Sequence, residues 1–334
     1  MTSVLLIPLA ALALHWDTQV SNTTSGLRGL SVVSRQVAWA SGTNGTFLKT
    51  TDGGQHWRLG VVPGAEALDF RDVEAFDENR AYLLASGEGE DSRVYKTSDG
   101  GSHWELLFTN PDGKGFFDAM AFWNESRGIL VGDPVDGQFA VFSTTDAGRS
   151  WQRRKTPAAL PGEGAFAASG TCLVTRGDGD AWFATGGPGG ARVFRTHDGG
   201  HTWRVAEAPL GGTRTAGIFS LAFADGKNGV AVGGDYQKPN AAEGTLALTH
   251  DGGKKWTSPS HSAFSYRSGV ASLGGKLVIA IGTAGSDISR DGGKTWEHFS
   301  DTNLNAVASS DGAVWAVGPE GVIVSGLATH HSHP

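Results

Sequence analysis

The sequence predicts an all-β fold, a seven-bladed β-propeller of four-stranded antiparallel blades. Three observations carry this prediction. One turn motif occurs six times along 334 residues, its aspartates are 47, 47, 52, 53 and 40 residues apart, and the amino-terminal end supplies a strand that the last repeat lacks. A period of this length matches one blade of a propeller.

The repeated motif reads [ST]-x-D-x-G-x-x-W. Its aspartates are Asp52, Asp99, Asp146, Asp198, Asp251 and Asp291, and its tryptophans are Trp57, Trp104, Trp151, Trp203, Trp256 and Trp296. An Asp–Gly pair favours the positive backbone torsions of a tight turn, and the carboxylate can accept hydrogen bonds from N–H groups two or three residues on. We expect each motif to be a structural corner between two strands rather than a functional site.

Three further strands recur between these corners. In the second repeat they are residues 70–76, 81–85 and 93–97, and residues 103–108 follow the corner as the fourth strand. A seventh unit begins at residue 304 and ends before any corner motif, so it lacks its fourth strand. Residues 15–20 resemble a fourth strand, and we expect them to complete the last blade and close the ring, which removes two exposed sheet edges.

Composition excludes several classes of protein. The net charge is −7 and no basic run occurs, which argues against a nucleic-acid partner. Cys172 is the single cysteine, so no intramolecular disulfide, thiolate cluster or C-x-x-C pair forms, and we expect a buried small side chain. No P-loop, dinucleotide fingerprint or zinc-protease motif is present, and we expect no cofactor and no metal.

The two ends of the chain differ from the repeats. Residues 4–14 are continuously apolar and too short to span a bilayer, and Ala11-x-Ala13 resembles a signal-peptidase site. We therefore predict a signal peptide at 1–13, one propeller domain at 14–327, and a disordered histidine-containing tail at 328–334. The alternative for the first segment is a frayed apolar terminus. Export places the protein in the periplasm or outside the cell, or in a thylakoid lumen if its host is photosynthetic.

The corner motifs resemble the Asp-box (BNR) repeats of sialidases, sortilin-type receptors, xyloglucan hydrolases and photosystem II stability/assembly factors. The last family is the most similar, in its length and in phrases such as residues 27–30, 39–43 and 49–54. The sialidase Phe/Tyr-Arg-Ile-Pro signature is absent. The resemblance implies an exported seven-bladed propeller that binds protein, with a membrane-protein assembly intermediate as partner if the family role holds.

The innermost strands suggest where a site lies. Their alignment puts Arg28, Arg71, Phe117, Glu163, Ile218, Arg267 and Leu304 at one level. It puts Gly29, Asp72, Asp118, Gly164, Phe219, Ser268 and Asn305 at the next. We expect three arginines to converge at the channel mouth opposite the corners and to bind carboxylates. The alternative is that each arginine pairs with Asp72, Asp118 or Glu163 and merely lines a polar channel.

Loops on the same side of the ring supply more candidates. They contain Asp133, Arg214, Tyr236 and Tyr266, and residues 234–244 form an insertion that we expect to act as a lip over the mouth. The predicted function is a non-catalytic, monomeric binding or scaffold protein, at most peripheral to a membrane, that holds a protein segment or acidic ligand. The alternative is a glycan-active enzyme or lectin that uses Asp72, Asp118, Asp133 and Glu163, with Tyr266 as a sialidase-like nucleophile.

Overall fold

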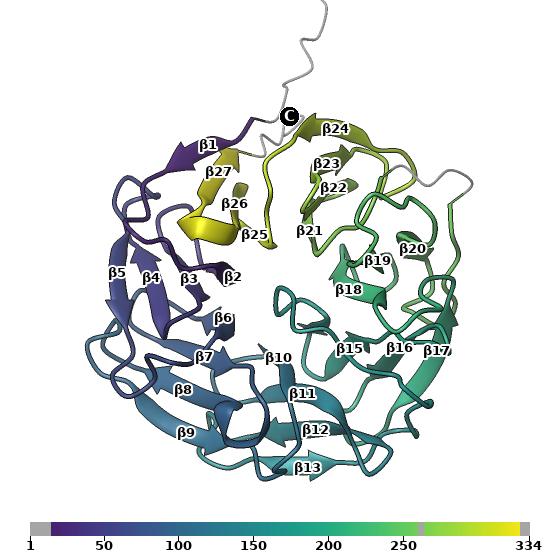
Figure 1. Ribbon diagram of the computed structural model, residues 1–334, viewed down its shortest axis with the longest axis horizontal. Helices are drawn as coiled ribbons and strands as arrows, with labels where there is room; N and C mark the ends of the chain where they lie inside the picture. The colour runs from purple at the N-terminus through teal and green to yellow at the C-terminus, as the bar shows by residue number, and fades with distance from the viewer. Residues whose placement is uncertain (1–14, 260–263, 328–334) are drawn as a thin grey trace, which may run out of the picture.

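A computed structural model describes residues 15–259 and 264–327, which form a ring of seven antiparallel sheets around a central opening (Figure 1). The sheets follow one another around the ring in chain order. This arrangement confirms the predicted seven-bladed propeller. The predicted signal peptide and the predicted histidine-containing tail lie outside the described residues.

Blades one to three each have four strands, counted from the innermost outward. Blade one contains β2 (Leu27–Val32), β3 (Ala38–Gly42), β4 (Thr46–Thr50) and β5 (Arg58–Val61). Blade two contains β6 (Phe70–Ala75), β7 (Ala81–Ala85), β8 (Arg93–Thr97) and β9 (Glu105–Thr109). Blade three contains β10 (Phe117–Phe122), β11 (Gly128–Val135), β12 (Gln138–Thr144) and β13 (Gln152–Arg154).

The remaining blades follow the same order with one exception. Blade four contains β14 (Leu173–Arg176), β15 (Asp180–Ala184), β16 (Ala191–Thr196) and β17 (Arg204–Ala208). Blade five has three strands, β18 (Ala216–Phe223), β19 (Gly229–Asp235) and β20 (Leu246–Thr249). Its predicted fourth strand is reduced to a bridge between Leu248 and Thr257.

Blade six contains β21 (Gly269–Gly274), β22 (Leu277–Gly282), β23 (Gly285–Ser289) and β24 (Glu297–Ser300). Blade seven contains β25 (Ala306–Ser310), β26 (Ala313–Val317), β27 (Ile323–Leu327) and β1 (Asp17–Gln19). Among the described residues, two short 3-10 helices, η1 (Gly89–Asp91) and η2 (Pro319–Gly321), lie in loops. Within the described part of the chain, no helix has the length and apolarity needed to cross a membrane.

The amino-terminal strand closes the ring, as the sequence predicts for residues 15–20. Strand β1 pairs antiparallel with β27, with Asp17 opposite Ser325 and Gln19 opposite Ile323. The Gln19 amide donates to Ser325 Oγ at 2.7 Å, and its carbonyl oxygen accepts from the indole of Trp57 in blade one at 2.7 Å. Buried Trp16 donates to Ser286 of blade six at 3.0 Å. This segment therefore holds three neighbouring blades together.

The Asp-box turns are self-contained corners. In the first, Asp52 Oδ1 accepts the His56 N–H at 3.0 Å and the Thr50 hydroxyl at 2.9 Å, while Thr50 Oγ1 accepts the Gly54 N–H at 2.9 Å. The hydrogen bond from the His56 backbone is the largest cause that lowers the pKa of Asp52, to about 2. The carboxylate is therefore ionised at neutral pH and is fully used within its own turn.

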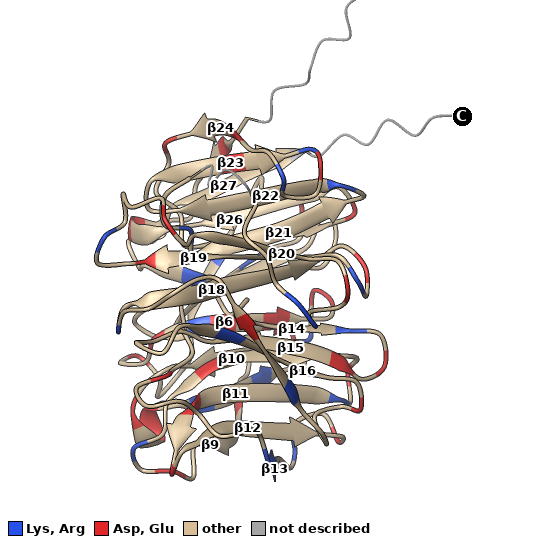
Figure 2. Ribbon diagram, turned by 90° about the vertical axis from the view of Figure 1, so that its right-hand side faces the viewer, with Lys and Arg blue, Asp and Glu red and all other residues tan. Residues whose placement is uncertain are grey.

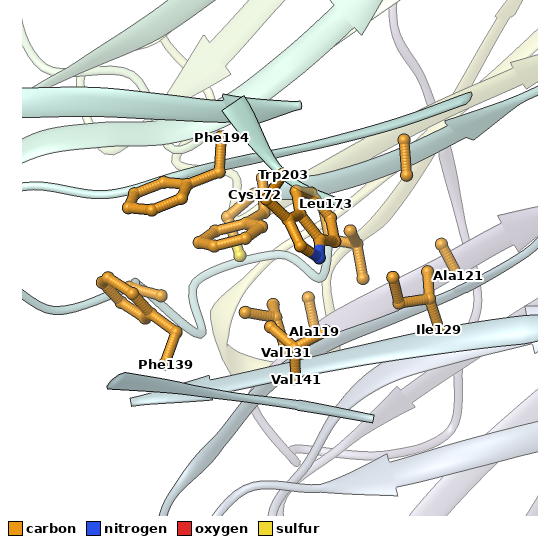
Figure 3. Packing of buried hydrophobic residues seen from close by; sticks show 13 residues of the cluster. Ala119, Ala121, Ile129, Val131, Phe139, Val141, Cys172, Leu173, Phe194 and Trp203 are labelled. Carbon is orange, nitrogen blue, oxygen red and sulfur yellow. The ribbon is translucent and has the colours of Figure 1, made fainter. Parts of the chain in front are cut away.

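Apolar side chains fill the space between neighbouring blades. Between blades three and four, Val131 and Val141 face Leu173 and Trp203, and Cys172 is buried among them (Figure 3). Burial raises the pKa of the Cys172 thiol well above its usual range, so the thiol stays protonated. This matches its predicted place as a small buried side chain. The faces of each blade are thus buried against the neighbouring blades. Charged residues lie mainly in the loops (Figure 2).

Replacing Trp182 by alanine should destabilise the ring. The Trp182 ring is fully buried, stacks on Phe223 with centroids 4.1 Å apart, and donates to the Gly252 carbonyl of blade five at 3.0 Å. We expect Trp182→Ala to lower the free energy of unfolding by about 3–5 kcal/mol in urea titrations. Leu59→Ala on the exposed strand β5 is the control and should change it by less than about 1 kcal/mol. A Trp182→Ala protein as stable as that control would contradict this description of the packing between blades.

Candidate functional site

A cavity of about 500 Å³ opens at the centre of the ring, where the innermost strands begin. Its lining comes from every blade and consists of Arg28, Arg71, Phe116, Asp118, Asp133, Ala165, Phe166, Ala167, Ala168, Phe219, Tyr236, Tyr266, Ser268, Thr283 and Asn305. The Asp-box turns contact the other end of the same strands, since the Gly53 N–H donates to Gln36 O in the loop after β2. The cavity therefore lies on the face opposite the corners, in a size range typical of ligand sites.

A β-bulge selects which residues face this cavity. In blades one, two, three and five, one residue of the innermost strand falls at a register shift and has no partner on the next strand, the second residue in blades one to three and the fourth in blade five. These unpaired residues are Arg28, Arg71, Asp118 and Phe219. In blades six and seven, Ser268 and Asn305 hold the same position, with their N–H groups donating to Ile281 O and Val317 O.

Glycines on the second strands allow this close arrangement. A Cβ atom added to Gly42 would lie 2.2 Å from the Gly26 carbonyl oxygen, and one added to Gly233 would lie 1.9 Å from that of Gly217. A side chain at either position would push the innermost strand away. These glycines therefore keep the bulges, and the residues on them, at the edge of the channel.

The expected alignment of the innermost strands was wrong by one residue in several blades. Arg28 and Arg71 share a level with Asp118, Phe219, Ser268 and Asn305. The residues before them, Leu27, Phe70, Phe117, Ile218 and Leu304, form the buried level between the blades. The sequence alignment matched arginine with arginine, whereas the apolar residues set the register.

Arg267 consequently does not join the other two arginines. It occupies a buried position of the apolar level, where its side chain is 2% exposed and donates from Nε to Asp287 Oδ2 on β23 at 2.7 Å. Burying a guanidinium is tolerated here because the carboxylate neutralises it and because Tyr266 O and Ser265 Oγ accept further hydrogen bonds from it, at 2.9 and 3.3 Å. The predicted convergence of three arginines is replaced by two.

Two other predicted site residues, Glu163 and Asp72, are also buried and form structural hydrogen bonds instead of facing the cavity. Glu163 is buried and accepts from Arg192 Nε at 2.8 Å and from the Thr185 hydroxyl at 2.6 Å, outside the cavity lining. Asp72 is buried and accepts the Met120 N–H of blade three at 2.8 Å, as Ser220 Oγ accepts the Val270 N–H of blade six. Burial raises the pKa of Asp72 to about 7. Arg214 is exposed and is absent from the cavity lining.

The two remaining arginines differ in their surroundings. Arg71 donates from Nε to Asp69 at 2.7 Å and lies over the Phe116 ring at 5.8 Å. Arg28 is half-buried, and no described residue gives it a hydrogen bond or an ion pair. Burial, and then the charge of Arg71, lower the pKa of Arg28. The mouth thus holds one guanidinium whose donors are all available.

Two carboxyl groups, those of Asp118 and Asp133, line the same cavity. Burial raises the pKa of Asp118 well above its usual range, and the nearby charge of Asp133 adds to this rise. Burial likewise raises the pKa of Asp133 to about 6, although its Oδ1 accepts the Ala165 N–H at 3.0 Å. Asp118 Oδ2 has no hydrogen-bond partner. Asp133 is therefore mostly ionised at pH 7, whereas the raised pKa of Asp118 disfavours its charged form, so the pair offsets the arginine charge by less than two full charges.

Aromatic rings form the opposite wall of the cavity. Phe166 stacks on Phe219 with centroids 4.0 Å apart, and Tyr266 and Tyr236 meet Phe219 edge-on at 4.9 and 6.2 Å. Tyr236 is 49% exposed and belongs to the insertion predicted to form a lip. The site therefore has a charged half from blades one to three and an aromatic half from blades four to six.

Phe166 and its neighbours were missed by the sequence reasoning. Residues 165–168 precede β14 and enter the cavity lining, because blade four starts its innermost strand late, at Leu173. The signal was present in the spacing of 52 residues between Asp146 and Asp198, which exceeds the preceding spacing by five residues. Such an excess shows that a loop is longer but does not show where the loop packs.

The fold and the cavity define an Asp-box seven-bladed β-propeller with a ligand-sized, partly cationic mouth. A family model described as photosynthesis system II assembly factor YCF48 matches residues 71–215, and a BNR/Asp-box repeat model matches residues 287–298. The chain is thus an Asp-box propeller that resembles the photosystem II assembly factors, which confirms the resemblance found in the sequence.

Solved structures share the same fold. A structure of YCF48 bound to D1 peptide has 17% sequence identity and a TM-score of 0.69, and the match covers 97% of this chain and 100% of that one. A structure of YCF48 from Cyanidioschyzon merolae has 17% identity and a TM-score of 0.63, with 93% and 98% covered. No curated protein matches the sequence at a significant level.

The raised pKa of Asp133 predicts a pH-dependent stability. An unfolded aspartate titrates near pH ~4, so between about pH 4 and 6 the folded protein binds more protons than the unfolded chain. The contribution of this group to stability therefore falls as pH rises through that window. Asp133→Asn keeps an acceptor for the Ala165 N–H and removes the titration. Relative to wild type, we expect the variant to gain about 1–3 kcal/mol between pH 4 and pH 7 in urea titrations.

Asp146→Asn is the matched control for that experiment. Hydrogen bonds from Ser150 lower the pKa of Asp146 to about 2, so the stability it contributes is lost only as pH falls from about 4 towards 2. The difference between this variant and wild type should stay flat from pH 5 to 7. A flat difference for Asp133→Asn over pH 4 to 7 would show that Asp133 is not a desolvated carboxyl.

Proposed function

We propose that this protein is a non-catalytic propeller that binds an anionic segment of a partner protein at the channel mouth. The observation that carries the proposal is Arg28, a half-buried guanidinium for which no described residue supplies a partner. A desolvated charge without a counterion is costly, and a carboxylate from a ligand would satisfy it with two parallel hydrogen bonds. Arg71, close enough to lower the pKa of Arg28, adds attraction for the same anion.

The aromatic half of the cavity favours a peptide as ligand. Phe166, Phe219 and Tyr266 line the same cavity as the arginines, and exposed Tyr236 can close over a bound chain. Tyrosine and arginine are the residue types that dominate protein-binding hot spots. We infer a segment that carries one or more carboxylates next to an apolar or aromatic side chain.

The comparisons support a protein partner of this kind. The family model describes an assembly factor, and one relative of the same fold was solved with a peptide bound. By analogy, the partner here is an assembly intermediate of a membrane protein, met outside the cytoplasm by a monomeric, exported propeller. The apolar residues 4–14 and the predicted cleavage site support the exported location.

Glycan hydrolysis is less well supported. A sialidase-like reaction needs an ionised tyrosine as nucleophile. Burial raises the pKa of Tyr266, and this effect outweighs the opposing charge of Arg28. Two of the four carboxyl groups named for catalysis, Asp72 and Glu163, lie outside the cavity lining and are used in structural hydrogen bonds.

Removing the Arg28 charge should weaken binding of an acidic peptide. The probe is a fluorescein-labelled octapeptide with three Asp or Glu residues and one Phe, compared with its Asn/Gln counterpart in fluorescence anisotropy titrations. We expect Arg28→Gln to raise Kd for the acidic peptide roughly 10- to 100-fold. This change in Kd corresponds to a loss of about 1.5–3 kcal/mol of binding free energy, the contribution of one charge-assisted hydrogen bond. The Asn/Gln peptide should bind weakly to both proteins.

Arg58→Gln is the matched control, because it removes one exposed arginine from the outer strand β5 and leaves the cavity intact. It should bind the acidic peptide within about twofold of wild type, allowing for a small change in long-range attraction. Equal losses in the Arg28 and Arg58 variants would mean that binding follows net charge, and the proposed site would be wrong.

A further inference from the structure

The wedges between neighbouring blades are filled by side chains at repeated positions. Between blades two and three, Tyr82 packs against Phe122 with ring centroids 4.5 Å apart, and its hydroxyl donates to the Ala147 carbonyl at 3.0 Å. Ala147 directly follows the Asp-box aspartate of blade three. One polar aromatic side chain, one phenyl ring and one backbone acceptor therefore fill this wedge.

The same set fills the wedge between blades four and five. Trp182 stacks on Phe223 at 4.1 Å, and its indole N–H donates at 3.0 Å to the carbonyl of Gly252. Gly252 again directly follows the Asp-box aspartate of the next blade. An indole and a phenol thus use an equivalent acceptor in two different wedges of this chain.

Between blades five and six both rings are missing. Val230 holds the position that Tyr82 and Trp182 hold in their own blades. Each of these residues follows the one that pairs with the threonine of the Asp-box, which is Gly229 in blade five. The strand register puts Ser272 at the position of Phe122 and Phe223, because each of these three lies opposite the residue that pairs with the Thr or Ser that begins the Asp-box. The acceptor position is retained as Gly292, after Asp291. A cavity of about 360 Å³ remains, lined by Val230, Ser272 and Gly292.

One wall of this cavity keeps the backbone acceptor that binds a ring in the other two wedges. The Gly292 N–H donates to Lys276 O, whereas no described residue donates to the Gly292 carbonyl. Lys276 and Lys294 also line the cavity. In blade two, the ammonium of Lys96 lies 5.1 Å from the Tyr82 ring centroid, and such a cation stabilises an aromatic face.

We propose that this wedge, defined by Val230, Ser272, Gly292 and Lys276, is a second binding site. It takes an aromatic ring that carries a hydrogen-bond donor, an indole or a phenol, in the position that Trp182 and Tyr82 occupy in their own wedges. The ring donates to the Gly292 carbonyl. This site lies on the Asp-box face and is independent of the channel mouth.

The test uses three probes in two-dimensional NMR titrations of the labelled protein. Indole is the simplest ring, 1-methylindole lacks the donor, and N-acetyl-tryptophanamide carries the ring as it stands on a peptide. We expect saturable shifts of the Val230, Ser272 and Gly292 amide signals with indole, and binding several-fold weaker with 1-methylindole. Binding of N-acetyl-tryptophanamide identifies a side chain of a partner as the source, and binding of indole alone identifies a small free molecule.

A variant whose own side chains fill the cavity tests the proposal most directly. Val230→Trp combined with Ser272→Phe copies the pair found between blades four and five, so it should abolish indole binding and raise Tm. Ser272→Phe alone is a second variant, which should weaken indole binding at least fivefold even if the double variant folds poorly. Gln152→Phe adds a ring to the exposed strand β13 and should leave binding unchanged. Absence of saturable binding to wild type, or unchanged binding to a folded Ser272→Phe protein, would overturn the proposal.

Discussion

The pairing of the amino-terminal strand with the last blade is the constraint on which the rest of the structure depends. Strand β1 adds three residues to β27, and Gln19 and Trp16 extend this link to blades one and six. Because the ring is closed, the seven innermost strands begin around one opening. A cavity lined from every blade exists only in that arrangement, since an open array would separate Arg28 in blade one from Asn305 in blade seven. Closure therefore creates the candidate site as well as the fold.

The bulge in the innermost strands of blades one, two, three and five determines much of the chemistry of that opening. In each of these four blades it turns one residue towards the channel and leaves its predecessor packed between blades. Arg28 and Arg71 fall on the bulge and face the cavity, whereas Arg267 falls one residue earlier and needs Asp287 to be buried. A single step in register thus separates a guanidinium that a ligand can reach from one that is part of the core.

Much of the fold followed from the sequence because its signals are local. The Asp-box turn is stabilised by its own side chains, so its pattern is visible without knowing the tertiary structure. The orphan strand at residues 15–20 was found by the same local pattern, through its likeness to residues 56–61. The candidate site was predicted less well, because it depends on register and packing. The sequence suggested Arg28, Arg71, Asp118, Asp133, Tyr236, Tyr266 and Asn305, and all of these line the cavity. It did not reveal the partner of Arg267, which lies 20 residues away on another strand, or the entry of Phe166 into the channel.

A crystal structure of the protein with the acidic octapeptide tests the central claim most directly. We predict a peptide carboxylate within hydrogen-bond distance, about 2.7–2.9 Å, of the Arg28 guanidinium, with the peptide's apolar side chain against Phe166 and Phe219. Peptide density on the Asp-box face, or at the mouth with Arg28 left without an anionic partner, would contradict the account.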